Sequence, residues 1–159
     1  MGVSGCGKST LGSALAEILG WRFVEGDDLH PPGNIAKMAA GIPLEDEDRW
    51  PFLENVALAI SEAGDHGIVA ACSALKRRYR DLIRARSGEV MFVLPMLDRE
   101  RLVARLALRR GHFMPPALLD SQLAELEALD PDERGVLVDA ADPLLAQITR
   151  VTAALRAFS

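Results

Sequence analysis

Eight residues near the start of the chain have the types and spacing of a phosphate-binding loop. The stretch Gly2-Val3-Ser4-Gly5-Cys6-Gly7-Lys8-Ser9 matches the pattern G-x-x-x-x-G-K-[ST]. Its glycines let the backbone approach an anion closely, and its N–H groups point inward at the positive end of a following helix. Lys8 would reach the β- and γ-phosphates, and the Ser9 hydroxyl would hold Mg²⁺. The pattern predicts that the chain binds a nucleoside triphosphate.

The sequence on either side of this loop agrees with that interpretation only in part. Residues 10–19 carry apolar side chains at helical spacing, which favours a true phosphate loop over a glycine-rich turn. Such a loop normally follows a buried strand, yet only Met1 precedes Gly2. We expect either that the natural chain begins some residues earlier with an apolar stretch, or that a truncated sheet leaves the protein poorly folded.

Phosphoryl transfer also requires a positioned nucleophile, and Asp27 is the candidate that would receive its proton. Asp27 follows a short apolar run and should face the phosphate loop, while Asp28 competes for the role or both simply form a turn. His30, which precedes two prolines, is either a substrate contact or a surface residue. Arg49 follows an acidic run and is either an anion ligand or a solvated partner of those acids.

Two groups of basic residues could meet anionic ligands. Lys76 and Arg80 lie four residues apart at the start of a predicted helix, where positive charge is unfavourable unless an anion is bound. Arg101, Arg105 and Arg109 repeat at the same spacing, and guanidinium groups suit phosphate oxygens. The alternative for both groups is a solvated basic surface.

The two cysteines indicate a reducing compartment rather than a disulfide scaffold. Cys6 lies within the loop beside Lys8, where the thiolate would be favoured. The simpler interpretation is that Cys6 fills space as a small residue.

Short apolar runs alternate with helical stretches, which is typical of parallel strands joined by helical crossovers. Strands are predicted at 22–25, 67–72, 90–94 and 135–138, and helices at 9–19, 46–63, 76–86, 99–110, 116–129 and 143–157. Ligands of such sheets collect at the carboxyl ends of the strands. The loop, Asp27 and residues 73–76 should therefore converge on one crevice.

Two segments interrupt this alternation. Residues 28–64 begin with prolines, glycines and four consecutive acids, and they look like an inserted substrate-binding region. Residues 109–118 begin Arg-Arg-Gly-His-Phe-Met-Pro-Pro, which suits a lid over phosphates. We therefore expect a single domain over residues 1–159.

Composition limits the classes of function. A chain of 159 residues with 49% hydrophobic residues can bury a full core. The net charge of -5 argues against a general nucleic-acid binder. No apolar run approaches the roughly 20 residues needed to cross a bilayer.

Taken together, these segments resemble the small bacterial-type gluconokinases, relatives of shikimate and adenylate kinases. The resemblance is carried by residues 2–10, 26–31, 34–44, 46–51, 72–76, 79–81 and 109–113, together with Leu119, Ser121 and Gln122. It implies an α/β three-layer P-loop kinase fold with a parallel sheet, inserted substrate-binding helices and a lid.

The same resemblance implies that ATP phosphorylates D-gluconate at O6 with Mg²⁺, in a cytoplasmic homodimer on the route into the pentose phosphate pathway. ATP would lie on Gly2–Thr10 and Arg105, and Asp27 would accept the hydroxyl proton, with Lys8 and Arg109 assisting the transfer. The substrate contacts implied are Asp27, His30, Arg49, Lys76, Arg80, His112 and Gln122. Alternatives are a kinase for shikimate or another hydroxy acid, and a catalytically silent ATP-binding regulator.

Overall fold

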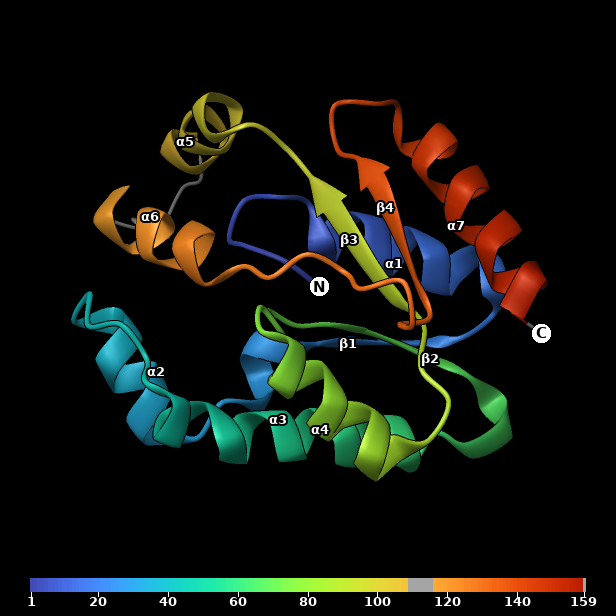
Figure 1. Ribbon diagram of the computed structural model, residues 1–159, viewed down its shortest axis with the longest axis horizontal. Coiled ribbons are helices and arrows are strands. Elements are labelled where there is room, and N and C mark those ends of the chain that lie inside the picture. Colours follow the sequence, from blue (N-terminus) through green and yellow to red (C-terminus); the bar gives the residue numbers. More distant parts are fainter. Residues whose placement is uncertain (109–115, 159) are drawn as a thin grey trace.

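The computed structural model describes residues 1–108 and 116–158 (Figure 1). Within these residues the strands form two parallel pairs rather than one continuous sheet. The first pair is β1 (Arg22–Glu25) with β2 (Ile68–Ala71), and the second is β3 (Phe92–Met96) with β4 (Gly135–Asp139). The predicted α/β class with parallel strands is confirmed. The continuous sheet that we expected is instead divided between β2 and β3, and the chain start lies between the two pairs (Figure 1).

Helices cover both faces of these strands. They are α1 (Lys8–Leu19), α2 (Pro32–Ala39), α3 (Asp46–Ser61), α4 (Arg77–Ser87), α5 (Arg99–Ala107), α6 (Pro116–Glu125) and α7 (Leu144–Phe158). Helix α1 packs on β1 and β2 and contacts α7, which covers β4, while α3 packs on β2 from the opposite side and pairs with α4. The result is the three-layer arrangement predicted from the alternating pattern (Figure 1).

Local sequence explains where several of these helices begin and end. Gly20 ends α1 in the left-handed conformation, with φ 68°, and its N–H bonds to the last free carbonyls. Glu45 and Asp48 form a reciprocal capping box at the start of α3. The Asp98 carboxylate accepts the Arg101 N–H at the start of α5.

The segment that sequence periodicity left irregular contains two further elements. A short 3-10 helix, η1 (Gly26–Leu29), follows β1 directly, and α2 begins with Pro32 in the first turn, where a missing N–H costs little. Both are too short for helical periodicity to reveal. The proposed inserted region at 28–64 thus contains α2 and α3.

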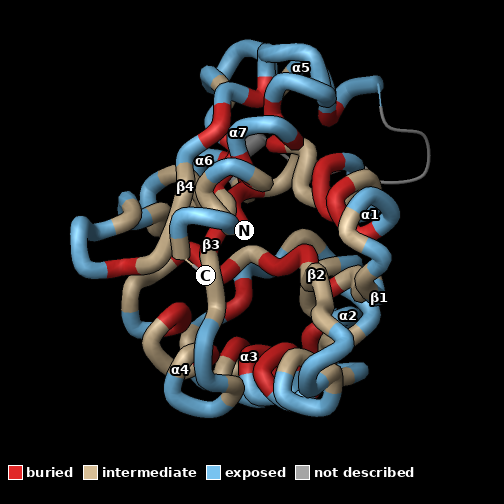
Figure 2. The backbone as a smooth tube through the Cα atoms, turned by 90° about the vertical axis from the view of Figure 1, so that its right-hand side faces the viewer, coloured by how far each residue is buried: buried red, intermediate tan, exposed pale blue. Residues whose placement is uncertain are grey.

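Within the described residues the core consists of three apolar clusters, and Figure 2 marks the buried stretches of the backbone in red. The first joins Phe52 and Val56 of α3 to Phe92 of β3 and includes Met1. The second joins the phosphate loop to α5 and α6, and the third joins α1 to β4 and α7. Packed apolar side chains therefore support the phosphate loop.

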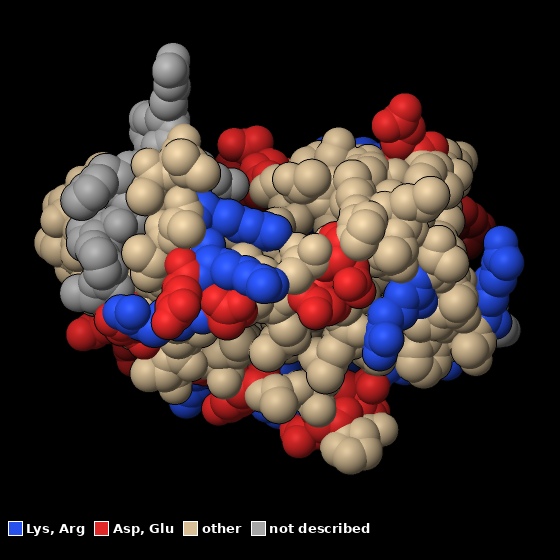
Figure 3. Space-filling view, turned by 90° about the horizontal axis from the view of Figure 1, so that it is seen from above, with Lys and Arg blue, Asp and Glu red and all other residues tan. Residues whose placement is uncertain are grey.

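On the face seen in Figure 3, basic side chains stand beside acidic ones instead of forming a continuous basic area over the described residues. This agrees with the acidic net charge. None of the helices within residues 1–108 and 116–158 is long and apolar enough to span a membrane.

Candidate active site

The phosphate loop has the backbone that its glycines predict. Gly2, Gly5 and Gly7 have φ values of 130°, 82° and 101°, in the region that other residues avoid. Helix α1 begins directly after Gly7, so its first N–H groups face the loop. A Cβ on Gly5 would lie 3.1 Å from Leu106 Cγ, so the loop also needs this glycine for close packing on α5. The loop backbone and the start of α1 are therefore suited to binding an anion.

Charged and polar side chains surround this loop. Lys8 Nζ donates to the Val3 carbonyl at 2.9 Å and so folds back over the loop. Arg105 Nη2 donates to the Ala140 carbonyl at 2.7 Å, and Nη1 lies 3.6 Å from where a Gly7 Cβ would stand. Ser9 is half-buried in the first turn of α1, whereas Thr10 is exposed. The structure thus places Arg105 beside the loop, as expected for a nucleotide contact.

Cys6 takes the simpler of its two predicted roles. Its side chain is 1% exposed and belongs to the apolar cluster of Val3, Leu75 and Leu102. Packing on every side favours a space-filling role over a reactive thiolate.

Asp27 lies at the carboxyl end of β1, in η1, as the sequence predicted. Gly26 holds this segment against β2, because a Cβ there would lie 2.2 Å from the Ala71 carbonyl oxygen. The chain after β2 in turn accepts the Gly2 N–H through Ser73 O at 2.9 Å. Asp27 is exposed, so its carboxylate is accessible to a ligand at this end of the strands.

His30 is held by stacking and by an amide. Its ring lies 3.7 Å from that of Phe52 at an interplanar angle of 8°, and Nδ1 is 3.2 Å from Asn34 Nδ2. Burial lowers the pKa of His30 below its ordinary value of 6.5; Asp27 opposes this shift and Arg49 adds to it. The imidazole is therefore neutral near pH 7 and can exchange hydrogen bonds with a hydroxyl.

This lowered pKa predicts a pH-dependent loss of stability. The unfolded chain binds a proton at His30 more readily than the folded chain, so the free energy of unfolding should fall as pH drops below about 6.5. In His30→Phe, which keeps an aromatic ring on Phe52, the fall between pH 7 and pH 5 should be smaller. Urea unfolding at both values measures this. The matched control His66→Phe should keep the wild-type fall, and an equal fall in both variants would contradict the prediction.

Arg49 and Lys76 meet on the two oxygens of one carboxylate. Arg49 Nη2 lies 2.9 Å from Glu125 Oε2, and Lys76 Nζ lies 3.2 Å from Glu125 Oε1. Lys76 also lies 3.2 Å from Asp46 Oδ1, which accepts the Tyr79 hydroxyl as well. Both cations lie within 6 Å of the Tyr79 ring centroid.

The charges within this cluster depend on one another. Burial opposes the charged form of Lys76, but hydrogen bonds to Asp46 and Glu125 hold its pKa above the ordinary value. The hydrogen bond from Tyr79, followed by those from Lys76, holds the pKa of Asp46 below its ordinary value. Two cations gathered around an acidic side chain in this way are suited to an external carboxylate.

Helix α6 connects this cluster to the phosphate loop. Gln122 Oε1 accepts the Ser4 N–H at 2.8 Å, and Glu125, one turn further along the same helix, holds Arg49 and Lys76. The family resemblance implied a substrate contact for Gln122, but the side-chain carbonyl oxygen of Gln122 lies on the loop. Glu125 was not among the predicted site residues, although its i, i+3 spacing from Gln122 was a usable signal.

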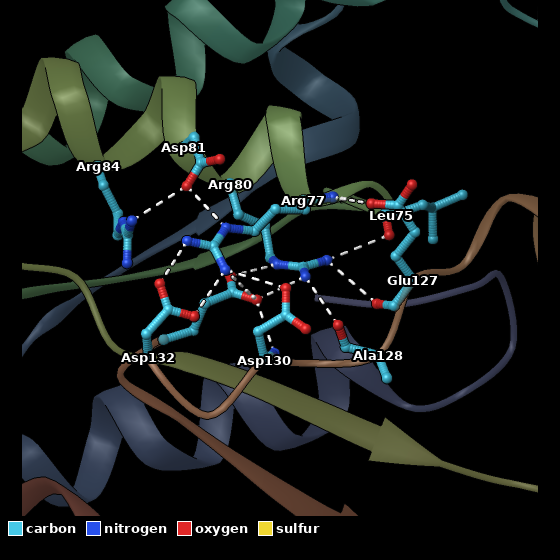
Figure 4. Close-up of polar contacts among 10 residues, drawn as sticks. Leu75, Arg77, Arg80, Asp81, Arg84, Glu127, Ala128, Asp130 and Asp132 are labelled. Carbon is cyan, nitrogen blue, oxygen red and sulfur yellow. Dashed lines mark hydrogen bonds and ion pairs between the residues drawn. The ribbon is translucent and has the colours of Figure 1, made fainter.

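Arg80 is not part of this cluster. The structure therefore does not support the substrate contact that was expected for Arg80 from the sequence. Its side chain is 0% exposed, and Nε and Nη2 bind the buried Glu133 carboxylate at 2.6 and 2.7 Å. Its remaining N–H groups donate to the carbonyls of Leu75, Glu127 and Ala128 (Figure 4). Arg80 therefore fastens the connection after α6 to α4. The predicted contacts Arg109 and His112 lie outside the described residues.

Comparisons with known proteins identify the family of the chain. The family model described as shikimate kinase matches residues 4–153. Gluconokinase of Gluconobacter oxydans strain 621H is 49% identical over 135 residues, covering 84% of this chain and 76% of the relative. Thermosensitive gluconokinase of Escherichia coli K12 is 46% identical over 140 residues, covering 86% and 74%.

A solved structure extends the likeness to three dimensions. The crystal structure of a gluconokinase from Sinorhizobium meliloti 1021 superimposes with a TM-score of 0.87 at 44% identity, covering 99% of this chain and 90% of that one. The phosphate loop, the strand-end aspartate and the cation cluster thus occur in a chain that belongs to the gluconokinase family of P-loop kinases.

Proposed function

We propose that this protein transfers the γ-phosphoryl group of ATP to O6 of D-gluconate, giving 6-phosphogluconate and ADP. One observation carries the proposal beyond family membership. Arg49 and Lys76 both bind the Glu125 carboxylate of α6, and Gln122 of the same helix accepts the Ser4 N–H of the phosphate loop, which supports a carboxylate-binding pair linked to that loop. A sugar acid offers both the carboxylate for this pair and the hydroxyl for phosphorylation.

The phosphate loop would bind the triphosphate through its N–H groups, with Arg105 at its side. Lys8 would leave the Val3 carbonyl to contact the β- and γ-phosphates. An Mg²⁺ ion in such a site takes few protein ligands and fills its shell with phosphate oxygens and water, so the Ser9 hydroxyl fits it. When bound, the ion neutralises charge on the phosphates.

On the acceptor side, the carboxylate of gluconate would bind Arg49 and Lys76 while His30 contacts a hydroxyl. Asp27 would accept the proton from O6 as that oxygen attacks phosphorus. Arg109 and His112 stay in the proposal on sequence grounds, as contacts to the phosphates and the acid. We assign Gln122 to positioning the loop and leave Arg80 out of the acid-binding set. We also propose a cytoplasmic homodimer that supplies 6-phosphogluconate to the pentose phosphate pathway.

A panel of hydroxyl acceptors tests the reaction itself. ADP release should be fast with gluconate and weak with shikimate or AMP. Turnover with shikimate or AMP and none with gluconate would overturn the assignment. ATP binding without turnover on any acceptor would instead favour the silent regulator.

The cation cluster makes a sharper prediction. Replacing Lys76 by Met should raise the KM for gluconate by about 10-fold or more, because a charged hydrogen bond contributes roughly 1.5–3 kcal/mol. The KM for ATP should change by less than about 2-fold, since Lys76 bonds to Asp46 and Glu125 and not to the loop. Steady-state kinetics in both substrates measures this. The control is Arg86→Met, an exposed position on α4, the helix that Lys76 precedes, and equal changes in both KM values would refute the acid-binding role.

A further inference from the structure

The His30 ring is held in a fixed place by residues of α2 and α3. It stacks on Phe52, with 3.7 Å between the ring centroids, and Phe52 itself is 1% exposed. Asn34 Nδ2 lies 3.2 Å from His30 Nδ1. The preceding carbonyl, that of Leu29, accepts a hydrogen bond from the Asn55 side chain at 3.0 Å. Because Asn34 takes up Nδ1, the ring nitrogen available to a ligand is Nε2.

The side-chain amide of Asn34 has one orientation that its surroundings allow. Its nitrogen lies 2.7 Å from the Asp48 carbonyl oxygen, and Asn34 is 5% exposed. A carbonyl oxygen can only accept a hydrogen bond, so the amide atom beside it must be the NH₂ group. The reversed amide would set two acceptor oxygens against each other in a buried place, which is unfavourable.

The Asp48 carbonyl that fixes this amide is itself held in place. Asp48 lies in the first turn of α3, where its carboxylate accepts the Glu45 N–H at 3.0 Å. Lys37 of α2 bonds to both oxygens of the same carboxylate, at 2.6 and 2.7 Å. The backbone N–H of Asn34 bonds to Pro31 O at 2.9 Å, at the start of α2. The amide therefore stands between two helices that are bonded to each other.

These hydrogen-bond directions determine the tautomer of His30. An amide NH₂ has two hydrogens, so it can donate one to Asp48 O and the other to His30 Nδ1. The pKa of His30, lowered by burial, keeps the ring neutral near pH 7, and a neutral imidazole has one donor and one acceptor nitrogen. Because Nδ1 is the acceptor, the proton lies on Nε2.

Given the proposed phosphorylation of gluconate, on which this rests, we propose that Asn34 is a positioning residue that holds His30 as the Nε2–H tautomer, so that His30 donates a hydrogen bond to a gluconate hydroxyl oxygen. The hydroxyl then keeps its own proton for Asp27, whose carboxylate is close enough to His30 to act on its charge. With the opposite tautomer, Nε2 and Asp27 would both be acceptors and would compete for one proton.

Nitrogen-15 NMR of the ligand-free protein at pH 7 measures the tautomer directly. His30 Nδ1 should have the chemical shift of an unprotonated nitrogen and Nε2 that of a protonated one, with both signals identified by their loss in His30→Phe. Asn34→Asp replaces the donor by an acceptor, so it should place a proton on Nδ1. It should also lower kcat/KM for gluconate by about 3- to 10-fold, the range expected for one neutral hydrogen bond. The KM for ATP should change by less than about 2-fold.

The matched control is Asn55→Asp, which adds the same charge at an exposed position of α3 and also removes an amide that holds this segment. It should keep His30 Nδ1 unprotonated and kcat/KM for gluconate within about 2-fold of wild type.

A protonated Nδ1 in the wild-type protein would overturn the proposal, and that measurement needs no variant to fold. A folded Asn34→Asp protein that keeps Nδ1 unprotonated, or that keeps the wild-type kcat/KM for gluconate, would overturn it as well. The tautomer is measured without substrate, so its failure and a failure of the acceptor panel can be told apart.

Discussion

Replacing Lys8 by Met should lower kcat by about 10²–10³-fold, the effect of deleting one preorganised donor to charge that develops in the transition state. The physical reason is the position of Lys8 at the junction of the phosphate loop and α1, where its ammonium can reach the transferred group. The fold should persist, because within residues 1–108 and 116–158 the side chain makes a single hydrogen bond, to Val3 O. Steady-state turnover and circular dichroism of the purified variant measure the two effects.

The matched control for this variant is Lys37→Met. Lys37 pairs with Asp48 within the inserted region, and its side chain is 42% exposed. It should keep turnover within about 2-fold of wild type. If Lys8→Met also kept turnover within that range, the loop would not be the site of phosphoryl transfer.

The largest effect on stability is expected at Arg80. Arg80→Met should lower the free energy of unfolding by about 3–5 kcal/mol, because it leaves the Glu133 carboxylate buried without its partner. The KM for gluconate should be nearly unchanged wherever the variant is folded. Guanidinium unfolding, followed by kinetics at low temperature, measures both. A raised KM with normal stability would return Arg80 to the acid-binding set.

Two companion variants isolate the cause. Adding Glu133→Leu to Arg80→Met should restore much of the lost stability, since the unpaired charge is then removed. Arg84→Met changes a neighbouring arginine that is 32% exposed and bonded to Asp81, and it should cost less than about 1 kcal/mol.

Acid should weaken the same pair. Burial raises the pKa of Glu133, but the hydrogen bonds from Arg80 and from the Asp130 N–H, together with the charges of Arg80 and Arg77, hold the pKa below its ordinary value of 4.5. The pair therefore stabilises the fold above that value, and its contribution is lost as pH falls through the lower pKa of the folded state.

Regular patterns made most of the fold predictable from sequence. The predicted strand at 22–25 coincides with β1, and the loop pattern fixed the start of α1 to within one residue. The alternation of strands and helices also predicted the strand at 67–72, which corresponds to β2, and the position of Asp27 at the end of a strand. Local pattern and tertiary packing agree at these places, which is why periodicity sufficed.

The candidate site was less predictable because it depends on where helices begin and on contacts between residues far apart in the sequence. The spacing of Lys76 and Arg80 suggested one helical face, but Lys76 is the N-cap of α4, with φ −96° and ψ 150°, outside the helical turn. The i, i+4 rule therefore does not apply, and the two side chains diverge. The partner of Arg80 is 53 residues away along the chain. No local pattern in the sequence identifies such a partner.

Helix α6 holds the phosphate loop through Gln122 and the cation pair through Glu125. A gluconate carboxylate that displaces Glu125 from Arg49 would release one contact of α6, while Gln122 of the same helix stays bonded to the Ser4 N–H. Linkage is reciprocal, so nucleotide and sugar acid would alter each other's affinity by one common factor. The ratio of each ligand's dissociation constants measured with and without the other ligand would give this factor.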